Sequence, residues 1–340
     1  MQISYPHEHL PEPGTAREVA PGVRWVRMPL PFALDHVNLW LLQDGSGWTA
    51  VDTGVALDPL KDCWRQLLPD YRLLRQIVTH WHPDHLGLAG WLEQQTGAKL
   101  WITESEYITS QMVSEQLGNF SNAAMIAMFR QHGLDERIAE EIASRGNAYK
   151  CNSSPAPLTY HRLFDGDNVA IGAHDWRVIV GYGHSAEHAA LYCAELQLLI
   201  SGDMLLPRIT TNVSIEAWSP DDNPLRLFFD SIARFESLPR DTLVLPSHGK
   251  PFRGLHNRIA ALRQHHQERF DALLAAVGQP RTAAELMPVL FTRPLDDAFQ
   301  VMLALGETIA HLNYLEDKRQ IARAETHGLI RFVKLHQPGD

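Results

Sequence analysis

The stretch THWHPDHLG at residues 79–87 constrains the fold most, because it places His80, His82, Asp84 and His85 within six residues. An apolar run before it predicts a strand, and apolar residues after it predict a helix. The four side chains therefore lie on a loop at the carboxyl end of a strand, where α/β proteins place their functional sites. Imidazole and carboxylate groups are ligands of zinc, iron and manganese. The stretch predicts an α/β fold with a metal site.

Three further candidate ligands share this setting. Each follows a short apolar run that predicts a strand, and each has a glycine or serine beside it: His184, Asp203 and His248. Small neighbours let the backbone and a ligand approach a metal closely. Two ions need more ligands than one loop supplies, so we expect these three side chains to join the first four.

This order of motifs resembles the metallo-β-lactamase-fold hydrolase superfamily, with its His-x-His-x-Asp-His signature, and its glyoxalase II-like members. The resemblance covers about the first 255 residues. It implies an αββα sandwich of two mixed sheets flanked by helices. It also implies one metal ion on His80, His82 and His184, a second on Asp84, His85 and His248, and Asp203 as the bridge between them. Asp52, in the motif VDTG, would hydrogen-bond to these ligands and orient them; the alternative is a turn aspartate.

A dinuclear metal centre of this kind implies hydrolysis. We expect two divalent ions, with zinc as the first expectation and iron or manganese as the alternatives. The ions lower the pKa of bound water, so a hydroxide that bridges them can attack at neutral pH. Asp84 and Asp203 are the expected catalytic carboxylates, and Asp203 would hold the cluster and take or orient a proton. No serine or cysteine nucleophile is needed.

The substrate is harder to predict than the chemistry. The resemblance favours a thioesterase that acts on an acyl-CoA or acyl-glutathione compound. A metal-dependent ribonuclease and a lactonase or β-lactamase are the alternatives. Arg208 could hold a carboxylate or phosphate of the substrate or pair with a structural acid, and Tyr182 could donate a hydrogen bond to the substrate. His188 could bind substrate, donate a proton or cap a strand.

The composition and net charge limit the classes of partner that we expect. The formal net charge is -10, which argues against nonspecific binding of nucleic acid. Cys63, Cys151 and Cys193 are scattered and odd in number, so we expect buried thiols and no disulfide framework. The first residues do not read as a secretory signal, and no apolar stretch is long enough to span a membrane. We therefore expect a cytoplasmic protein with a small-molecule acyl substrate and no membrane partner, and a homodimer stays open.

The domain organisation follows from shifts in pattern. We expect a catalytic domain at 1–254, with an irregular arm at 1–20 and a helical insert at about 104–147. The insert could line an apolar substrate pocket with its methionines and aromatics, or its helices could pack on one another or on a second subunit. Residues 255–340 predict three helices and a two-stranded ribbon, which resembles a winged-helix domain. On the first of these helices we expect His256, His265 and His266 to lie on a solvated face. The expected recognition helix is too acidic for phosphate contact, so we expect this domain to pack or to shape the mouth of the site.

Overall fold

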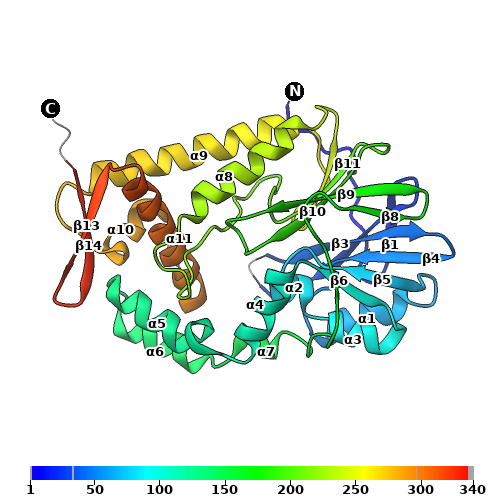
Figure 1. The fold of residues 1–340 in the computed structure, drawn as a ribbon, viewed down its shortest axis with the longest axis horizontal. Coiled ribbons are helices and arrows are strands. Elements are labelled where there is room, and N and C mark those ends of the chain that lie inside the picture. The colour runs from blue at the N-terminus through cyan, green and yellow to red at the C-terminus, as the bar shows by residue number, and fades with distance from the viewer. Residues whose placement is uncertain (1, 33, 296, 336–340) are drawn as a thin grey trace. The chain divides into compact units, whose positions relative to one another are not determined.

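The computed structural model describes residues 2–32, 34–295 and 297–335 of the 340-residue chain (Figure 1). The chain divides into two compact units. The first, called the sandwich unit here, consists of Met1–Ser114, Ala148–Thr211 and Ser231–Ile259. The second, called the helical unit, consists of Glu115–Asn147, Asn212–Asp230 and Ala260–Asp340.

The sandwich unit contains a seven-stranded mixed sheet in which the strands lie in sequence order. It is antiparallel from β1 to β4 and parallel from β4 to β7. Its strands are β1 (Ala16–Ala20), β2 (Val23–Pro29), β3 (His36–Asp44), β4 (Gly47–Val51), β5 (Leu73–Ile77), β6 (Lys99–Ile102) and β7 (His161–Arg162). The irregular arm expected at 1–20 is thus wrong for its last five residues, which form β1 and pair with β2.

A second sheet of five strands has the order β12-β11-β10-β9-β8. The pairing is antiparallel from β8 to β11 and parallel between β11 and β12. Its strands are β8 (Asn168–Ile171), β9 (His174–Gly181), β10 (His188–Cys193), β11 (Leu198–Gly202) and β12 (Leu243–Pro246). Because β9, β11 and β12 run in the same direction, their carboxyl ends meet at one edge of the sheet.

The two sheets pack face to face around an apolar core. Trp25 and Trp40 pair across β2 and β3 with stacked rings 6.2 Å apart, and they share this core with Val178 and Leu191 of the second sheet. Alternate strand residues point to opposite faces, so Val26 and Met28 of β2 face a second core, which the sheet forms with helices. These helices are α1 (Asp58–Leu67) and α3 (Ala89–Thr96), whose apolar side chains cover the outer face of the seven-stranded sheet.

The other sheet also carries helical segments on its outer side. Arg234, the last residue of α8 (Pro224–Arg234), donates a hydrogen bond to the carbonyl oxygen of Val180 on β9. Arg258, near the start of α9 (Leu255–Ala276), donates to the carbonyl oxygen of Leu206 beyond β11. The expected sandwich of two mixed sheets flanked by helices is therefore confirmed.

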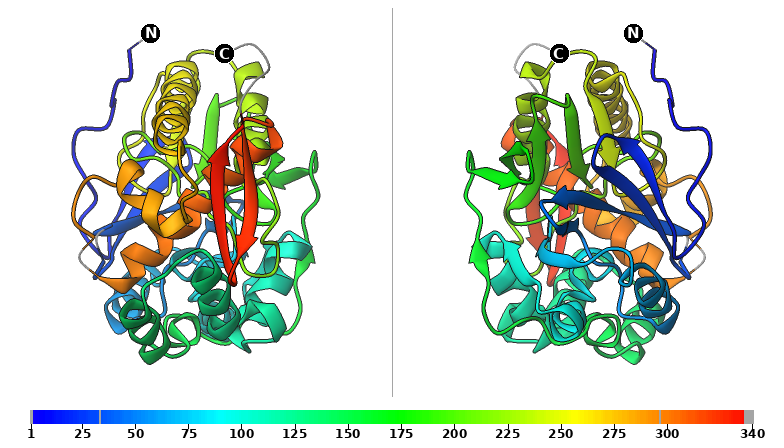
Figure 2. Two further views of the ribbon diagram at one scale, coloured as in Figure 1. Left: turned by 90° about the vertical axis from the view of Figure 1, so that its left-hand side faces the viewer. Right: turned by 90° about the vertical axis from the view of Figure 1, so that its right-hand side faces the viewer.

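The helical unit holds most of the remaining helices. They are η1 (Gly118–Phe120), α5 (Asn122–Gln131), α6 (Glu136–Ser144), α10 (Ala283–Leu290), α11 (Ala298–Asp317) and the larger part of α9. The ribbon of β13 (Ile321–Thr326) and β14 (Leu329–Lys334) follows and is drawn in red in Figure 2. Three helices and a ribbon were expected after residue 255, and these elements are confirmed.

The insert at 104–147 contributes to both units. Helix α4 (Glu104–Ser114) belongs to the sandwich unit, as does α7 (Ala148–Cys151), which begins just beyond the insert. Helices α5 and α6 pack on each other in the helical unit, and α6 also packs against α11, so that Ile126, Phe129 and Ile142 are buried. These two helices thus bury their apolar faces inside their own unit.

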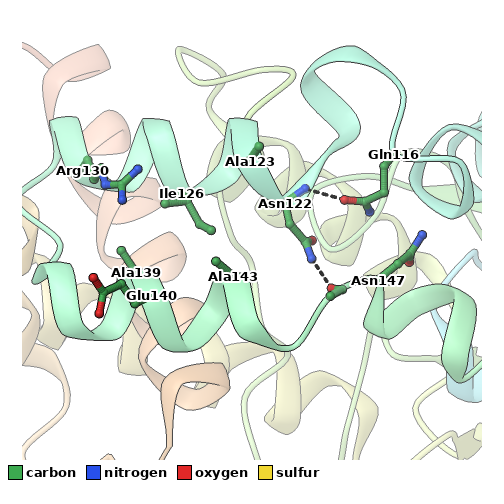
Figure 3. A pocket seen from close by; sticks show the side chains of 10 residues that line it. Gln116, Asn122, Ala123, Ile126, Arg130, Ala139, Glu140, Ala143 and Asn147 are labelled. Carbon is green, nitrogen blue, oxygen red and sulfur yellow. Dashed lines mark hydrogen bonds between the residues drawn. The ribbon is translucent and has the colours of Figure 1, made fainter.

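A pocket of about 450 Å³ lies between α5 and α6 (Figure 3). At its edge the amide side chain of Asn122 donates to the carbonyl oxygen of Gly146. Its lining residues include none of the insert's three methionines, and Met128 is buried in the packing of α5 instead. The lining is Gln116, Asn122, Ala123, Ile126, Arg130, Ala139, Glu140, Ala143, Gly146 and Asn147.

Two expectations about polar side chains need correction. Cys63 and Cys193 are buried as expected, but Cys151, the last residue of the short helix α7, is exposed. His266 on α9 was expected on a solvated face with its neighbours, yet its side chain is fully buried against His311 of α11.

Among the described helices, none combines the length and the apolar character that a membrane span requires.

Candidate metal centre

The candidate ligands all lie just beyond strands that end at one side of the sandwich. His80 and His82 follow β5, and the short helix α2 (Pro83–Leu86) then carries Asp84 and His85. His184 follows β9, Asp203 follows β11, and His248 follows β12. The apolar side chains of these strands are buried in the core between the two sheets. The polar residues that follow lie just beyond this core, where the strands end.

Three ring nitrogens form the first group. His80 Nε2 lies 2.9 Å from His82 Nδ1 and 3.2 Å from His184 Nε2. Burial comes first among the causes that hold the pKa of both His80 and His82 well below the usual value, and the neighbouring histidines add to it. These rings are therefore neutral at pH 7, with lone pairs that can bind a cation.

The second group combines a carboxylate with two imidazoles. Asp84 Oδ2 lies 3.5 Å from His85 Nε2 and 3.5 Å from His248 Nε2. Burial alone would lower the pKa of His85, but the carboxylates of Asp84, Asp52 and Asp203 raise it to about 10. The surroundings thus favour positive charge at this position, which a divalent ion would supply in place of the proton.

Asp203 faces both groups. Its Oδ2 lies 3.5 Å from His184 Nε2, while its Oδ1 lies 3.5 Å from His248 Nε2 and 3.7 Å from His85 Nε2. Burial would raise the pKa of Asp203, but His248 and His85 hold it well below the usual value, so the carboxylate is ionised. The structure thus brings all seven candidate ligands together.

The donor set fits divalent metal ions. There are three overlapping groups, and within each group the ligand atoms lie within 4.8 Å of one another: His80, His82 and His184; His80, His85 and Asp203; and Asp84, His85 and His248. Neither His85 Nε2 nor Asp203 Oδ1 has a hydrogen-bond partner among the residues that the structure describes, although both atoms are buried. A buried polar atom without a partner is costly, and a metal ion would remove that cost at both atoms.

Asp52 holds two of the histidines in orientation. Its side chain is almost fully buried and accepts hydrogen bonds from His85 Nδ1 at 2.8 Å and from the backbone N–H of Thr79 at 2.7 Å. The hydroxyl of Thr79 also contacts Asp52 and lies 3.0 Å from His80 Nδ1. These partners direct Nε2 of His80 and His85 into the cluster. Asp52 has a φ of 64°, a strained value for any residue but glycine, as is common at functional sites.

Two partners of the cluster escaped the sequence analysis. The carbonyl oxygen of His36 accepts a hydrogen bond from His248 Nδ1 at 2.8 Å, and His36 Nε2 accepts one from the backbone N–H of Gly249. Glu106 on α4 is fully buried and accepts a hydrogen bond from the backbone N–H of Trp81. Neither residue follows a strand or belongs to a recognisable motif, so no local signal marks it.

The three candidate substrate contacts lie in different settings. Tyr182 is 38% exposed, and Arg208 is exposed with its guanidinium 5.5 Å from the Tyr5 ring. Arg208 makes no ion pair within the described part of the chain. His188 is instead fully buried: its Nε2 accepts a hydrogen bond from the backbone N–H of Asp203, and its ring stacks on His80. His188 therefore lies behind the ligands, while Tyr182 and Arg208 are accessible from solvent.

Comparison with known proteins agrees with this architecture. The model of the metallo-beta-lactamase superfamily matches residues 33–248, and that of the metallo-beta-lactamase-like C-terminal domain matches residues 270–335. The crystal structure of a beta-lactamase domain protein from Burkholderia ambifaria has 43% sequence identity and a TM-score of 0.91, over 98% of this chain and 98% of that one.

Two curated relatives carry hydrolase names. A probable metallo-hydrolase of Bacillus subtilis, YqjP, is 24% identical over 87% of this chain and 92% of its own length. A hydroxyacylglutathione hydrolase of Pseudomonas aeruginosa is 26% identical over 63% of this chain and 78% of its own length. Since the superfamily model matches well over half of the chain and a structure with 43% identity covers nearly all of it, this chain is a member of the metallo-beta-lactamase superfamily, a metallo-hydrolase with the superfamily's C-terminal domain.

Proposed function

We propose that the protein hydrolyses a thioester of the acyl-CoA or acyl-glutathione type and uses two divalent metal ions, with zinc as the first choice. The position of Asp203, with one carboxylate oxygen toward each group of ligands, supports a paired site most strongly. The choice of a thioester rests on the hydroxyacylglutathione hydrolase relative at 26% identity.

Divalent ions, when bound, lower the pKa of water and polarise a carbonyl oxygen. The protein's own side chains would do the rest. His80, His82 and His184 would hold one ion, and Asp84, His85 and His248 the other. Asp203 is ionised, and it would contact both ions through its two oxygens. It would also accept or orient a proton of the attacking water. Asp52 keeps the Nδ1 proton of His85 engaged, which leaves Nε2 free for the ion.

Substrate recognition would involve the accessible side chains. Glutathione carries carboxylates and coenzyme A carries phosphates, and either group suits a guanidinium. Arg208 follows Pro207, whose ring packs against Gly249 beside the ligand His248. An Arg208 that makes no ion pair among the described residues is free to bind such an anion near the ligands. The phenol of Tyr182 could donate a hydrogen bond to the acyl group.

The proposal is tested by substrate turnover. The purified full chain, stripped of metal and reloaded with zinc, iron or manganese, is offered acyl-CoA, acyl-glutathione, lactone, cephalosporin and RNA substrates. We expect the thioesters to be hydrolysed fastest, and only with metal. Efficient cleavage of RNA or of a lactone, with no turnover of any thioester, would overturn the proposed substrate class.

Removal of single ligands tests the site itself. His82→Ala and Asp203→Ala should each lower kcat/KM at least about 100-fold, more than the loss of an orienting partner costs, and reduce the bound metal. His174→Ala is the control, because His174 pairs with Glu195 at the surface of the same unit. Full activity and full metal content in either ligand variant would refute its assigned role.

A further inference from the structure

Glu106 is a fully buried acid of the sandwich unit whose contact with the Trp81 backbone has not yet been given a role. Its side chain is fully buried, yet it makes no ion pair with any described residue. Its carboxylate instead accepts three hydrogen bonds. Oε2 accepts from the backbone N–H of Trp81 at 2.9 Å, and Oε1 accepts from the hydroxyl of Ser185 at 2.7 Å and the backbone N–H of Glu187 at 2.6 Å.

These three donors come from the two loops that supply the first group of ligands. Trp81 lies between His80 and His82, on the loop after β5 of the seven-stranded sheet. Ser185 directly follows His184, on the loop after β9 of the five-stranded sheet. One carboxylate therefore joins the ends of two strands from different sheets, and each end carries ligands of the same group.

Neighbouring contacts strengthen this junction. The Thr103 hydroxyl donates to the carbonyl oxygen of Glu187, and the backbone N–H of Ser105 donates to the Glu187 carboxylate. On the other side, the Tyr149 hydroxyl of α7 donates to the carbonyl oxygen of Trp81 at 2.8 Å. The peptide groups of Trp81 are thus held on both sides, through N–H by Glu106 and through C=O by Tyr149.

We infer that Glu106 is a positioning residue that fixes the distance between the loop of His80 and His82 and the loop of His184, and so sets the metal affinity of that group. The inference rests on the metal site of the proposed function, but not on its substrate. All three partners are donors, and the two oxygens of the carboxylate together accept from all of them. An amide of the same size would turn an N–H toward at least one donor, because it has a single oxygen.

The variant Glu106→Gln tests this directly. Zn²⁺ is titrated into the metal-free full chain against a chelating indicator, and thermal unfolding of the metal-free protein checks that the variant is folded. We expect one of the two equivalents to bind about 10–100-fold more weakly than in the wild type. The matched control is Glu104→Gln, which makes the same change on the same helix, where Glu104 is 41% exposed and pairs with Arg162. It should bind both equivalents normally.

Two backgrounds separate positioning from a general effect on folding. In His248→Ala, which retains the first group, adding Glu106→Gln should weaken the remaining equivalent. In His184→Ala, which retains the second group, the same change should leave the remaining equivalent unaltered. Equal weakening in both backgrounds, or wild-type affinities in Glu106→Gln itself, would overturn the inference. A wild type that binds no Zn²⁺ would instead overturn the proposed function, which keeps the two failures distinct.

Discussion

Gly202, at the end of β11, is packed so closely that no side chain fits there. A Cβ atom would lie 2.2 Å from His188 Nε2, and the φ of 52° disfavours any residue with a side chain. Gly202→Ala should therefore cost about 1–2 kcal/mol for the backbone conformation and about 1–3 kcal/mol more for the displacement of His188. Urea unfolding of the metal-free protein measures the loss.

Gly118→Ala provides the matched comparison for that prediction. Gly118 has a nearly identical φ of 55°, but a Cβ atom there would meet nothing within 4 Å. The Gly118 variant should lose only the conformational part of the free energy of unfolding. Equal losses in the two variants would show that the contact with His188 contributes nothing.

Among single residues, the metal ligands could be predicted from the sequence, but the residues that position these ligands could not. The seven ligand positions follow apolar strands, and this local signal is visible without a structure. His36 and Glu106 lack such a signal because their partners lie far away in the chain: 212 residues separate His36 from His248, and 79 separate Glu106 from Ser185. Only the folded chain brings them together.

Among the elements, α10 begins with a capping box. The Thr282 hydroxyl accepts a hydrogen bond from the backbone N–H of Glu285, and the Glu285 carboxylate accepts one from the N–H of Thr282. Thr282→Ala should lower the free energy of unfolding by about 1 kcal/mol relative to Thr282→Ser, which keeps the hydroxyl and loses the same methyl group. If the alanine and serine variants unfold at the same denaturant concentration, the cap does not stabilise the helix.

The end of α5 should respond to acid through His132. Burial lowers the pKa of this side chain to about 4, with a further contribution from Arg323 that Asp221 opposes. Between about pH 6.5 and pH 4 the unfolded chain binds a proton that the folded chain excludes, so stability falls as pH falls. The slope is about 1.4 kcal/mol per pH unit for this one group. Unfolding of His132→Gln across this range should show a correspondingly shallower slope, and an unchanged slope would contradict the assignment.

Two features were not predicted correctly from the sequence, strand β1 and the burial of His266. Strand β1 contains Arg17 and Glu18 and only one buried residue, Val19, so it lacks the alternation that marks a strand. His266 was misplaced because its polar side chain suggested exposure, although it lies on the buried face of α9, one helical turn after Leu262. Its burial depends on a hydrogen bond to His311 of α11, an element 45 residues further along the chain.

At the scale of the whole molecule, the site depends on the alignment of two sheets. The backbone N–H of Asn38 on β3 donates to the carbonyl oxygen of Ser247 beyond β12, and the N–H of Ala189 on β10 donates to the carbonyl oxygen of Thr79 beyond β5. These bonds hold together strand ends that belong to different sheets. The order of apolar strands and ligand loops predicted this sandwich, whereas the cross-sheet bonds that align its halves have no counterpart in the sequence pattern.

The central claim is that seven side chains from these strand ends hold two divalent ions. Crystals of the protein loaded with Zn²⁺, measured on both sides of the zinc absorption edge, locate such ions directly. We predict two anomalous peaks, one on each side of Asp203. One should be in contact with His80, His82 and His184, and the other with Asp84, His85 and His248. A fully loaded crystal with no peak at these side chains, or with its zinc bound elsewhere, would contradict the account.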